Sequence, residues 1–174
     1  SIAIFSVTYQ LLFIYSIDVP GRGTMEAFLT DGLRSIMSNI PAKEMSEYTV
    51  RWPGHIEKFI QEREAGSLDI DEMINERRFD HEVPEFTWMQ VSAIDTLGNK
   101  MDWVVSDSGG YDGSSMARTT GLVTVGCIQA WIKDSDMLAP GIHAPENLPT
   151  AAVKSIIDMM RSNGVEIIGP DIIL

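Results

Sequence analysis

The hydrophobic positions of the N-terminal part follow two different periods, and each period predicts a different kind of element. Residues 1–17 are rich in Ile, Phe, Val, Thr and Tyr, which favour a buried strand. The Pro and Gly residues of 18–23 then predict a turn. After this turn, apolar residues recur at intervals of three and four, which predicts an amphipathic helix over 24–39, interrupted only by Gly32. The apolar positions of this helix are Met25, Phe28, Leu29, Leu33, Ile36 and Met37.

The middle of the chain reads as a strand, a helix and a charged segment. Residues 48–52 alternate apolar and polar side chains as a strand does, and Pro53 suits the first turn of a helix that continues through Ile60. Residues 62–81 are heavily charged and contain a possible short helix over 69–79. Such a pattern is typical of a solvated surface rather than of a binding site.

The C-terminal half begins with the strongest local pattern. Two strands, 86–95 and 101–106, are joined by the turn-forming residues 97–100, which predicts a β-hairpin. A polar, glycine-rich loop over 106–115 leads into a long apolar helix over 115–134. Loops of this kind, held by a rigid scaffold, often line binding sites.

The chain closes with one more helix and one more strand. Pro149 opens a helix that runs to about Arg161, Gly164 ends it, and residues 165–168 form a short strand. Strands and helices are thus mixed without regular alternation, which predicts the α+β class, with helices packed on a mixed β-sheet. A chain of 174 residues with 44% apolar content is expected to form a single domain over 1–174.

The charge and the single cysteine exclude several classes of function. Thirteen Lys and Arg against 25 Asp and Glu give a net charge of -12, which repels nucleic acid and anionic lipid alike. Cys127 has no second thiol, which excludes a disulfide framework and fits a cytoplasmic protein. Residues 1–17 are too short and too polar to cross a membrane comfortably and lack a basic leader, so a core strand is preferred to a membrane or signal segment.

Several catalytic and cofactor motifs are absent. Gly21 and Gly23 lie between an apolar strand and a predicted helix, but Glu26 occupies the third glycine position of a dinucleotide fingerprint. Its carboxylate would face the pyrophosphate, so this chain is not expected to bind NAD by that mechanism. The sequence also has no phosphate-binding loop, no Gly-x-Ser-x-Gly elbow and no histidine pair at metal spacing. No metal site is expected.

Two predicted helix starts carry the remaining candidate chemistry. Arg51 and His55 flank the start of one helix, and Arg118 lies in the first turn of another. A helix start presents unpaired N–H groups and a positive dipole end, which suits a carboxylate-bearing small metabolite. The candidate site residues are therefore Asp31, Arg51, His55, Arg118, Thr119 and Thr120.

Each of the three strongest candidates has a structural alternative. Arg118 needs an anionic partner, which either a ligand or a carboxylate of the protein can supply. His55 is either a neutral base, because the positive helix end disfavours the imidazolium, or a hydrogen-bonded capping histidine. Asp31 either orients a cationic amine or caps a local turn.

Three motifs, taken in chain order, resemble the C-terminal domain of the saccharopine dehydrogenase family. They are Gly23–Leu33, Thr49–Lys58 and Ser115–Gly121. The family includes lysine 6-dehydrogenases and carboxynorspermidine dehydrogenases. The resemblance implies a substrate-binding and dimerisation domain of an oxidoreductase that acts on the C–N bond of an amino acid or polyamine derivative. It also implies a separate Rossmann domain, outside this sequence, that carries NAD or NADP.

The resemblance assigns roles to the candidate residues. Arg51 and Arg118 would hold substrate carboxylates, with additional contacts from Thr119 and Thr120. His55 would be the catalytic acid or base, and Asp31 the partner of the substrate amine. The alternative is a stand-alone, non-catalytic ligand-binding or interaction module of the same fold.

The last predicted helix carries an apolar stripe with consequences for assembly. In a complete enzyme this stripe could pack against the Rossmann domain, and without that domain it should seek a second copy of the chain. We therefore expect a homodimer. The stripe consists of Leu148, Ala152, Ile156, Met159 and Met160.

Overall fold

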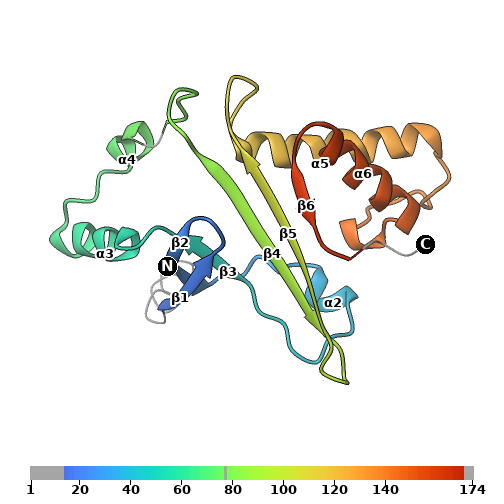
Figure 1. Cartoon of the computed structure of the whole chain (residues 1–174), viewed down its shortest axis with the longest axis horizontal. Helices are drawn as coiled ribbons and strands as arrows, with labels where there is room; N and C mark the ends of the chain where they lie inside the picture. Colours follow the sequence, from blue (N-terminus) through green and yellow to red (C-terminus); the bar gives the residue numbers. More distant parts are fainter. Residues whose placement is uncertain (1–13, 77, 171–174) are drawn as a thin grey trace. The chain divides into compact units, whose positions relative to one another are not determined.

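The computed structural model describes residues 14–76 and 78–170, and the chain divides into two compact units, residues 1–77 and residues 78–174 (Figure 1). Each unit holds one three-stranded antiparallel sheet with helices, so the α+β class is confirmed. The mixed sheet is wrong for the described residues, in which every strand pairing is antiparallel. The single-domain organisation stays a prediction.

The first unit is built on the sheet β1 (Ile14–Val19), β2 (Gly23–Leu29) and β3 (Tyr48–Arg51), in that order. A tight turn joins β1 to β2, since Arg22 N–H donates to the Val19 carbonyl at 2.9 Å. Two glycines with positive φ make the turn possible, Gly21 at 73° and Gly23 at 85°. The predicted turn is confirmed, and residues 1–13 of the predicted first strand lie outside the described residues.

The helix predicted over 24–39 is wrong. The chain forms strand β2 there, followed by a bend and the short helix α2 (Ile36–Asn39). The apolar residues fit both periods, but Met25 and Ala27 are the buried positions, with 4% and 3% exposure, and they are two residues apart. Pairing with β1 on one side and β3 on the other therefore overrides the helical spacing.

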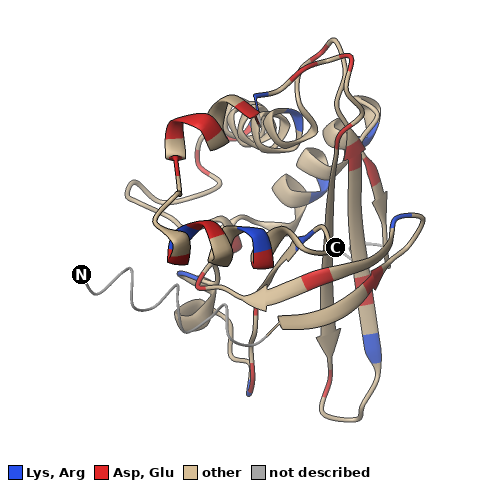
Figure 2. Cartoon of the chain, turned by 90° about the vertical axis from the view of Figure 1, so that its left-hand side faces the viewer, with Lys and Arg blue, Asp and Glu red and all other residues tan. Residues whose placement is uncertain are grey.

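Two helices follow β3 in the first unit. α3 (His55–Ala65) begins two residues later than Pro53 predicts, because Gly54 has a φ of 80° and forms the N-cap. Gly66, with a φ of 67°, ends it. α4 (Ile70–Glu76) lies within the predicted short helix and has no buried residue. Charged side chains line both helices, as a solvated surface requires (Figure 2).

The second unit is built on the sheet β4 (Phe86–Ile94), β5 (Lys100–Ser108) and β6 (Glu166–Ile168). The β4–β5 hairpin is confirmed, and its turn is held by Asp95, whose carboxylate accepts the N–H groups of Leu97 and Asn99. The described helices are α5 (Ser115–Lys133), a 3-10 turn (Pro145–Asn147) and α6 (Thr150–Ser162). Predictions for these helices hold to within one or two residues.

The core of the second unit lies between α6, α5 and the sheet. Ile156, Met160 and Val165 are buried there, and α5 approaches closely because Gly126 has no side chain, its Cβ position lying 3.0 Å from Ile156 Cγ1. The apolar stripe of α6 is thus covered within its own unit, so it is not the open surface that the sequence suggested. The homodimer itself stays a prediction. None of the described helices is both long and apolar enough to span a membrane.

Candidate functional site

The six predicted site residues divide evenly between the two units. Asp31, Arg51 and His55 belong to the first unit, and the other three belong to the second. The two sets are described separately below.

In the first unit, Arg51 and His55 lie close together in the chain, on either side of a short turn. Arg51 ends β3, is exposed, and donates from Nη1 to the Val50 carbonyl at 3.0 Å. His55 is the first residue of α3 and is partly buried, and its backbone N–H donates to the Trp52 carbonyl at 3.1 Å. The strand end and the helix start therefore form one local cluster.

Asp31 lies at the other end of the strand pair. Arg51 is directly opposite Glu26 in the β2–β3 register, whereas Asp31 follows the end of β2 at Leu29. The strand alone carries the chain about 10 Å from Glu26 to Leu29, at about 3.3 Å per residue, before the bend that contains Asp31. Asp31 is exposed, in the bend that precedes α2. The arrangement therefore separates Asp31 from the cluster that contains Arg51.

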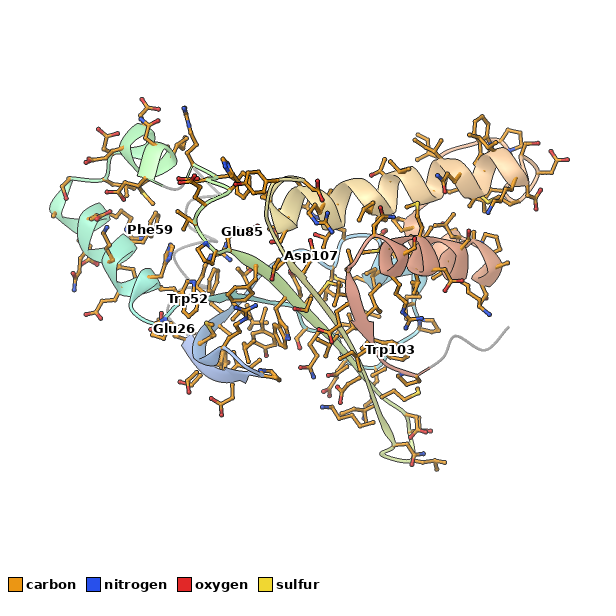
Figure 3. The ribbon with its side chains drawn as sticks, turned by 45° about the horizontal axis from the view of Figure 1, so that its top comes forward. Glu26, Trp52, Phe59, Glu85, Trp103 and Asp107 are labelled. Atoms are coloured by element: carbon orange, nitrogen blue, oxygen red, sulfur yellow. The ribbon has the colours of Figure 1, made fainter. Side chains whose placement is uncertain are left out.

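The residue opposite Arg51 in the strand register is Glu26, which is labelled in Figure 3 and was not among the predicted site residues. Its Oε1 accepts the N–H of Gly54, the N-cap of α3, at 3.0 Å. Its Oε2 is buried and has no hydrogen-bond partner among the described residues. A buried carboxylate oxygen without a partner costs stability, so a hydrogen-bond donor that reached this atom would be favoured. In a strand, Glu26 lies between the buried residues Met25 and Ala27 and so points to the opposite face of the sheet. The sequence shows this only if the segment is interpreted as a strand.

The bend at Asp31 is held by a different carboxylate. Glu47 Oε2 accepts from the Gly32 N–H at 2.6 Å and from Thr30 Oγ1 at 2.7 Å. A Cβ on Gly32 would lie 2.5 Å from that oxygen, so a larger residue would push the Glu47 carboxylate away. The close approach that Gly32 suggested in the sequence is therefore made by Glu47, and it is structural.

In the second unit, the start of α5 is already occupied by a carboxylate of the protein. Glu85 Oε1 accepts the Ser115 N–H at 2.5 Å, and Glu85 Oε2 accepts the Ser115 hydroxyl at 2.6 Å. Thr87 Oγ1 lies 2.7 Å from that hydroxyl, and Ser115 is fully buried. A Cβ on Gly109 would overlap Glu85 Oε1, so a larger residue there would displace this carboxylate. The positive end of α5 is therefore neutralised internally.

Arg118 also has its partners within the protein. Its Nε lies 2.9 Å from Asp107 Oδ2, and its Nη2 donates to the Asn163 carbonyl at 2.7 Å. Asp107 is 6% exposed, and its hydrogen bonds raise the pKa of the Arg118 guanidinium above its ordinary value against the effect of desolvation. Nη1 is 3.7 Å from the exposed Asp112. Of the two partners that the sequence left open, the protein carboxylate is present.

The two threonines differ in position and in use. Thr119 Oγ1 donates to the Ser115 carbonyl at 2.8 Å, one turn back along α5. Thr120 is exposed, and because it is two residues from Arg118 it lies on nearly the opposite side of the helix. The two threonines therefore do not face one ligand together with Arg118.

Gly21 and Gly23 lie in the turn between two antiparallel strands rather than between a strand and a helix, so they do not fit a dinucleotide pyrophosphate. Within residues 14–76 and 78–170, no three His, Cys, Asp or Glu side chains come together as a metal site requires.

Among known proteins, no family model matches this chain, and no curated protein matches it. The resemblance to the saccharopine dehydrogenase family therefore rests on the three sequence motifs and stays a prediction.

Proposed function

We propose that this chain binds an amino acid or an amino-acid-like polyamine derivative at the start of α3. We further propose that it is the substrate-binding part of an NAD(P)-dependent oxidoreductase acting on the C–N bond of that substrate. The observation that carries the proposal is Glu26, whose Oε1 accepts the N–H of the α3 N-cap and whose buried Oε2 has no hydrogen-bond partner among the described residues. That oxygen would accept a hydrogen bond from the substrate ammonium group.

Arg51 supplies the opposite charge. Directly opposed residues of an antiparallel pair place their side chains on the same face, so Arg51 and Glu26 project from the same face of the sheet. Only the hydrogen bond from Nη1 to the Val50 carbonyl is present for Arg51 among the described residues. The remaining N–H groups suit bidentate binding of a substrate carboxylate. An α-amino acid requires a hydrogen-bond acceptor for its ammonium group and hydrogen-bond donors for its carboxylate. Glu26 and Arg51 offer these on one face of the sheet.

His55 would serve as the acid or base. It starts α3 and is partly buried, next to the Gly54 N–H that holds Glu26. In amine oxidation the substrate ammonium must lose a proton before a hydride leaves its carbon, and a neutral imidazole accepts that proton. The redox step belongs to a nicotinamide cofactor, which the resemblance assigns to a Rossmann domain outside this sequence.

In this proposal Arg118 is structural. Asp107 and Asn163 already bind two of its nitrogens, and displacing the buried Asp107 would leave a charge without a partner. Glu26 replaces Asp31 as the partner of the substrate amine, because Glu26 lies beside Arg51 and Asp31 does not.

The test is binding of saccharopine and of L-lysine to the protein, measured by titration calorimetry. Glu26→Gln keeps the size and the contact with Gly54 but removes the charge, and we expect at least tenfold weaker binding. Asp31→Asn is the matched control and should bind as the wild type does. Equal affinity for the wild type and Glu26→Gln, or a loss confined to Asp31→Asn, would overturn the proposal.

The alternative is a non-catalytic ligand-binding or interaction module. It is favoured by the exposed apolar residues of α5, which include Ile128, Trp131 and Ile132 at 51%, 56% and 72% exposure. A ligand-binding module would use the Glu26 site without redox chemistry, whereas an interaction module would use the apolar residues of α5. The oxidoreductase and this alternative are distinguished by whether addition of NAD or NADP to the longest natural form of the protein, with the bound amine, produces reduced nicotinamide.

A further inference from the structure

A hollow lies in the second unit, between α6 and the sheet. It is a cavity of about 230 Å³. Its apolar walls come from Trp103, Ile157, Ile167 and Pro170. Lys154, Asp158 and Arg161 line it with charge. None of these residues belongs to the site proposed above.

The apolar wall is fixed in position by the end of the sheet. Trp103 lies on β5, and its Nε1 donates to the Pro170 carbonyl at 3.2 Å (Figure 3). The chain passes so close to the indole that a Cβ on Gly169 would lie 2.3 Å from Trp103 Cδ1. The indole is therefore held on one edge while part of its surface faces the hollow. An aromatic ring in such a position binds apolar and aromatic groups.

The charged side of the hollow comes from one face of α6. Lys154, Asp158 and Arg161 are spaced by four and three residues, so they lie on the same side of the helix. Arg161 is pinned by a hydrogen bond from Nη2 to the Ile167 carbonyl at 3.0 Å. The side chains of Lys154 and Asp158 have no hydrogen bond or ion pair in the part of the chain that the structure describes. A cation and an anion without partners thus stand beside an apolar pocket.

This combination selects a particular class of ligand. The ammonium group of a small molecule would pair with Asp158. Its carboxylate would pair with Lys154 and Arg161. The volume is below the range of about 300–1,000 Å³ that drug-sized ligands occupy, so it suits a single small metabolite. We propose that the α6 pocket binds a free amino acid with an apolar side chain, which rests on Trp103, at a site separate from that at Glu26.

The test uses three ligands that differ by one charge each. L-phenylalanine carries both charges, N-acetyl-L-phenylalanine lacks the ammonium, and L-phenylalaninamide lacks the carboxylate. Binding is measured by calorimetry on the Glu26→Gln variant, so that the first site does not contribute. We expect L-phenylalanine to bind at least tenfold more tightly than either analogue.

Two substitutions in that background locate the site. Lys154→Ala and Asp158→Ala should each weaken binding of L-phenylalanine by about tenfold, since each removes one charged partner. Lys133→Ala is the control, because Lys133 is an exposed lysine on α5 that lines only the neighbouring groove. It should leave affinity unchanged.

The outcomes are separable. No binding of L-phenylalanine, or equal binding by all the variants, would overturn the α6 pocket without affecting the proposal for Glu26. Equal binding of N-acetyl-L-phenylalanine would also overturn it, because the ligand would then be the carboxyl end of a peptide rather than a free amino acid.

Discussion

The two units place a carboxylate at the start of a helix in two different ways. At α5, both oxygens of Glu85 are bound by Ser115, and glycine at 109 lets the chain close over them. At α3, Glu26 uses one oxygen for the Gly54 N–H, and the other is buried without a partner among the described residues. The first arrangement is complete and supports structure, whereas the second is one donor short and suits a ligand.

The charged pairs differ in the same way. Arg118 is bound by Asp107 and the Asn163 carbonyl, so its charge is satisfied within the unit. Arg51 is exposed, and its guanidinium makes only one hydrogen bond in the described part of the chain, to the Val50 carbonyl. Residue types alone made the two helix starts look equivalent. The number of partners on each carboxylate is what separates them.

The largest expected effect comes from breaking the satisfied pair. Asp107→Ala leaves Arg118 largely buried without its main partner, which should lower the free energy of unfolding by about 3 kcal/mol. Urea denaturation followed by circular dichroism measures this change. Asp112→Ala removes an exposed carboxylate 3.7 Å from the same guanidinium and should change stability by less than about 0.5 kcal/mol. Equal losses would contradict the structural role of Asp107.

A second effect tests the closed helix start. Glu85→Ala removes the acceptor for the Ser115 N–H and hydroxyl, so it should cost about 2 kcal/mol of stability. Gly109→Ala should also destabilise the fold, because the new Cβ would overlap Glu85 Oε1. Thermal unfolding checks both variants. If neither one shifts the melting temperature, the carboxylate is not holding α5.

Glu26→Gln should weaken ligand binding more than it lowers stability, unlike the substitutions at Asp107 and Glu85. An amide keeps an acceptor for the Gly54 N–H and removes the buried charge at the position of Oε2. The free energy of unfolding should therefore change by less than about 1 kcal/mol. Binding of the amine ligand should nevertheless fall by at least tenfold. A variant that unfolds readily, while the wild type binds no amine, would assign Glu26 to structure like Glu85.

The smallest effect lies in the β4–β5 turn. Hydrogen bonds from the side chain and the backbone of Asn99 lower the pKa of Asp95 below its ordinary value of 3.8. A lowered pKa in the folded state stabilises the turn above pH 3.8, and this contribution is lost as the pH falls through the folded pKa. Asn99→Ala should therefore raise the pKa of Asp95 toward that of an unstructured chain. Carboxyl-carbon NMR titration measures the shift, and an unchanged pKa would contradict the assigned cause.

The sequence predicted the second unit more accurately than the first. The hairpin, α5 and α6 were predicted closely because long periodic segments and glycine turns specify them locally. The segment around Met25 was mispredicted because its apolar residues satisfy a helical and a strand period at once, and only pairing with β1 and β3 decides between them. β3 begins only at Tyr48, far along the chain from β2, so a local pattern does not show that pairing.

The site was only partly predictable for the same reason. Arg51 and His55 were found because they flank a recognisable helix start. Glu26 was missed because its register opposite Arg51 depends on the strand that was mispredicted. The partner of Arg118 was left open because Asp107 lies on another element, and nothing in the local sequence specifies that pairing.

The most direct test is a carboxyl-carbon NMR titration of the two glutamates with saccharopine. Glu26 has one oxygen without a partner among the described residues, whereas both oxygens of Glu85 are bound by Ser115. We therefore expect the Glu26 signal to shift when ligand is added and the Glu85 signal to stay unchanged. A ligand-dependent shift at Glu85 with none at Glu26 would contradict the account, and so would the absence of any shift at saturating ligand.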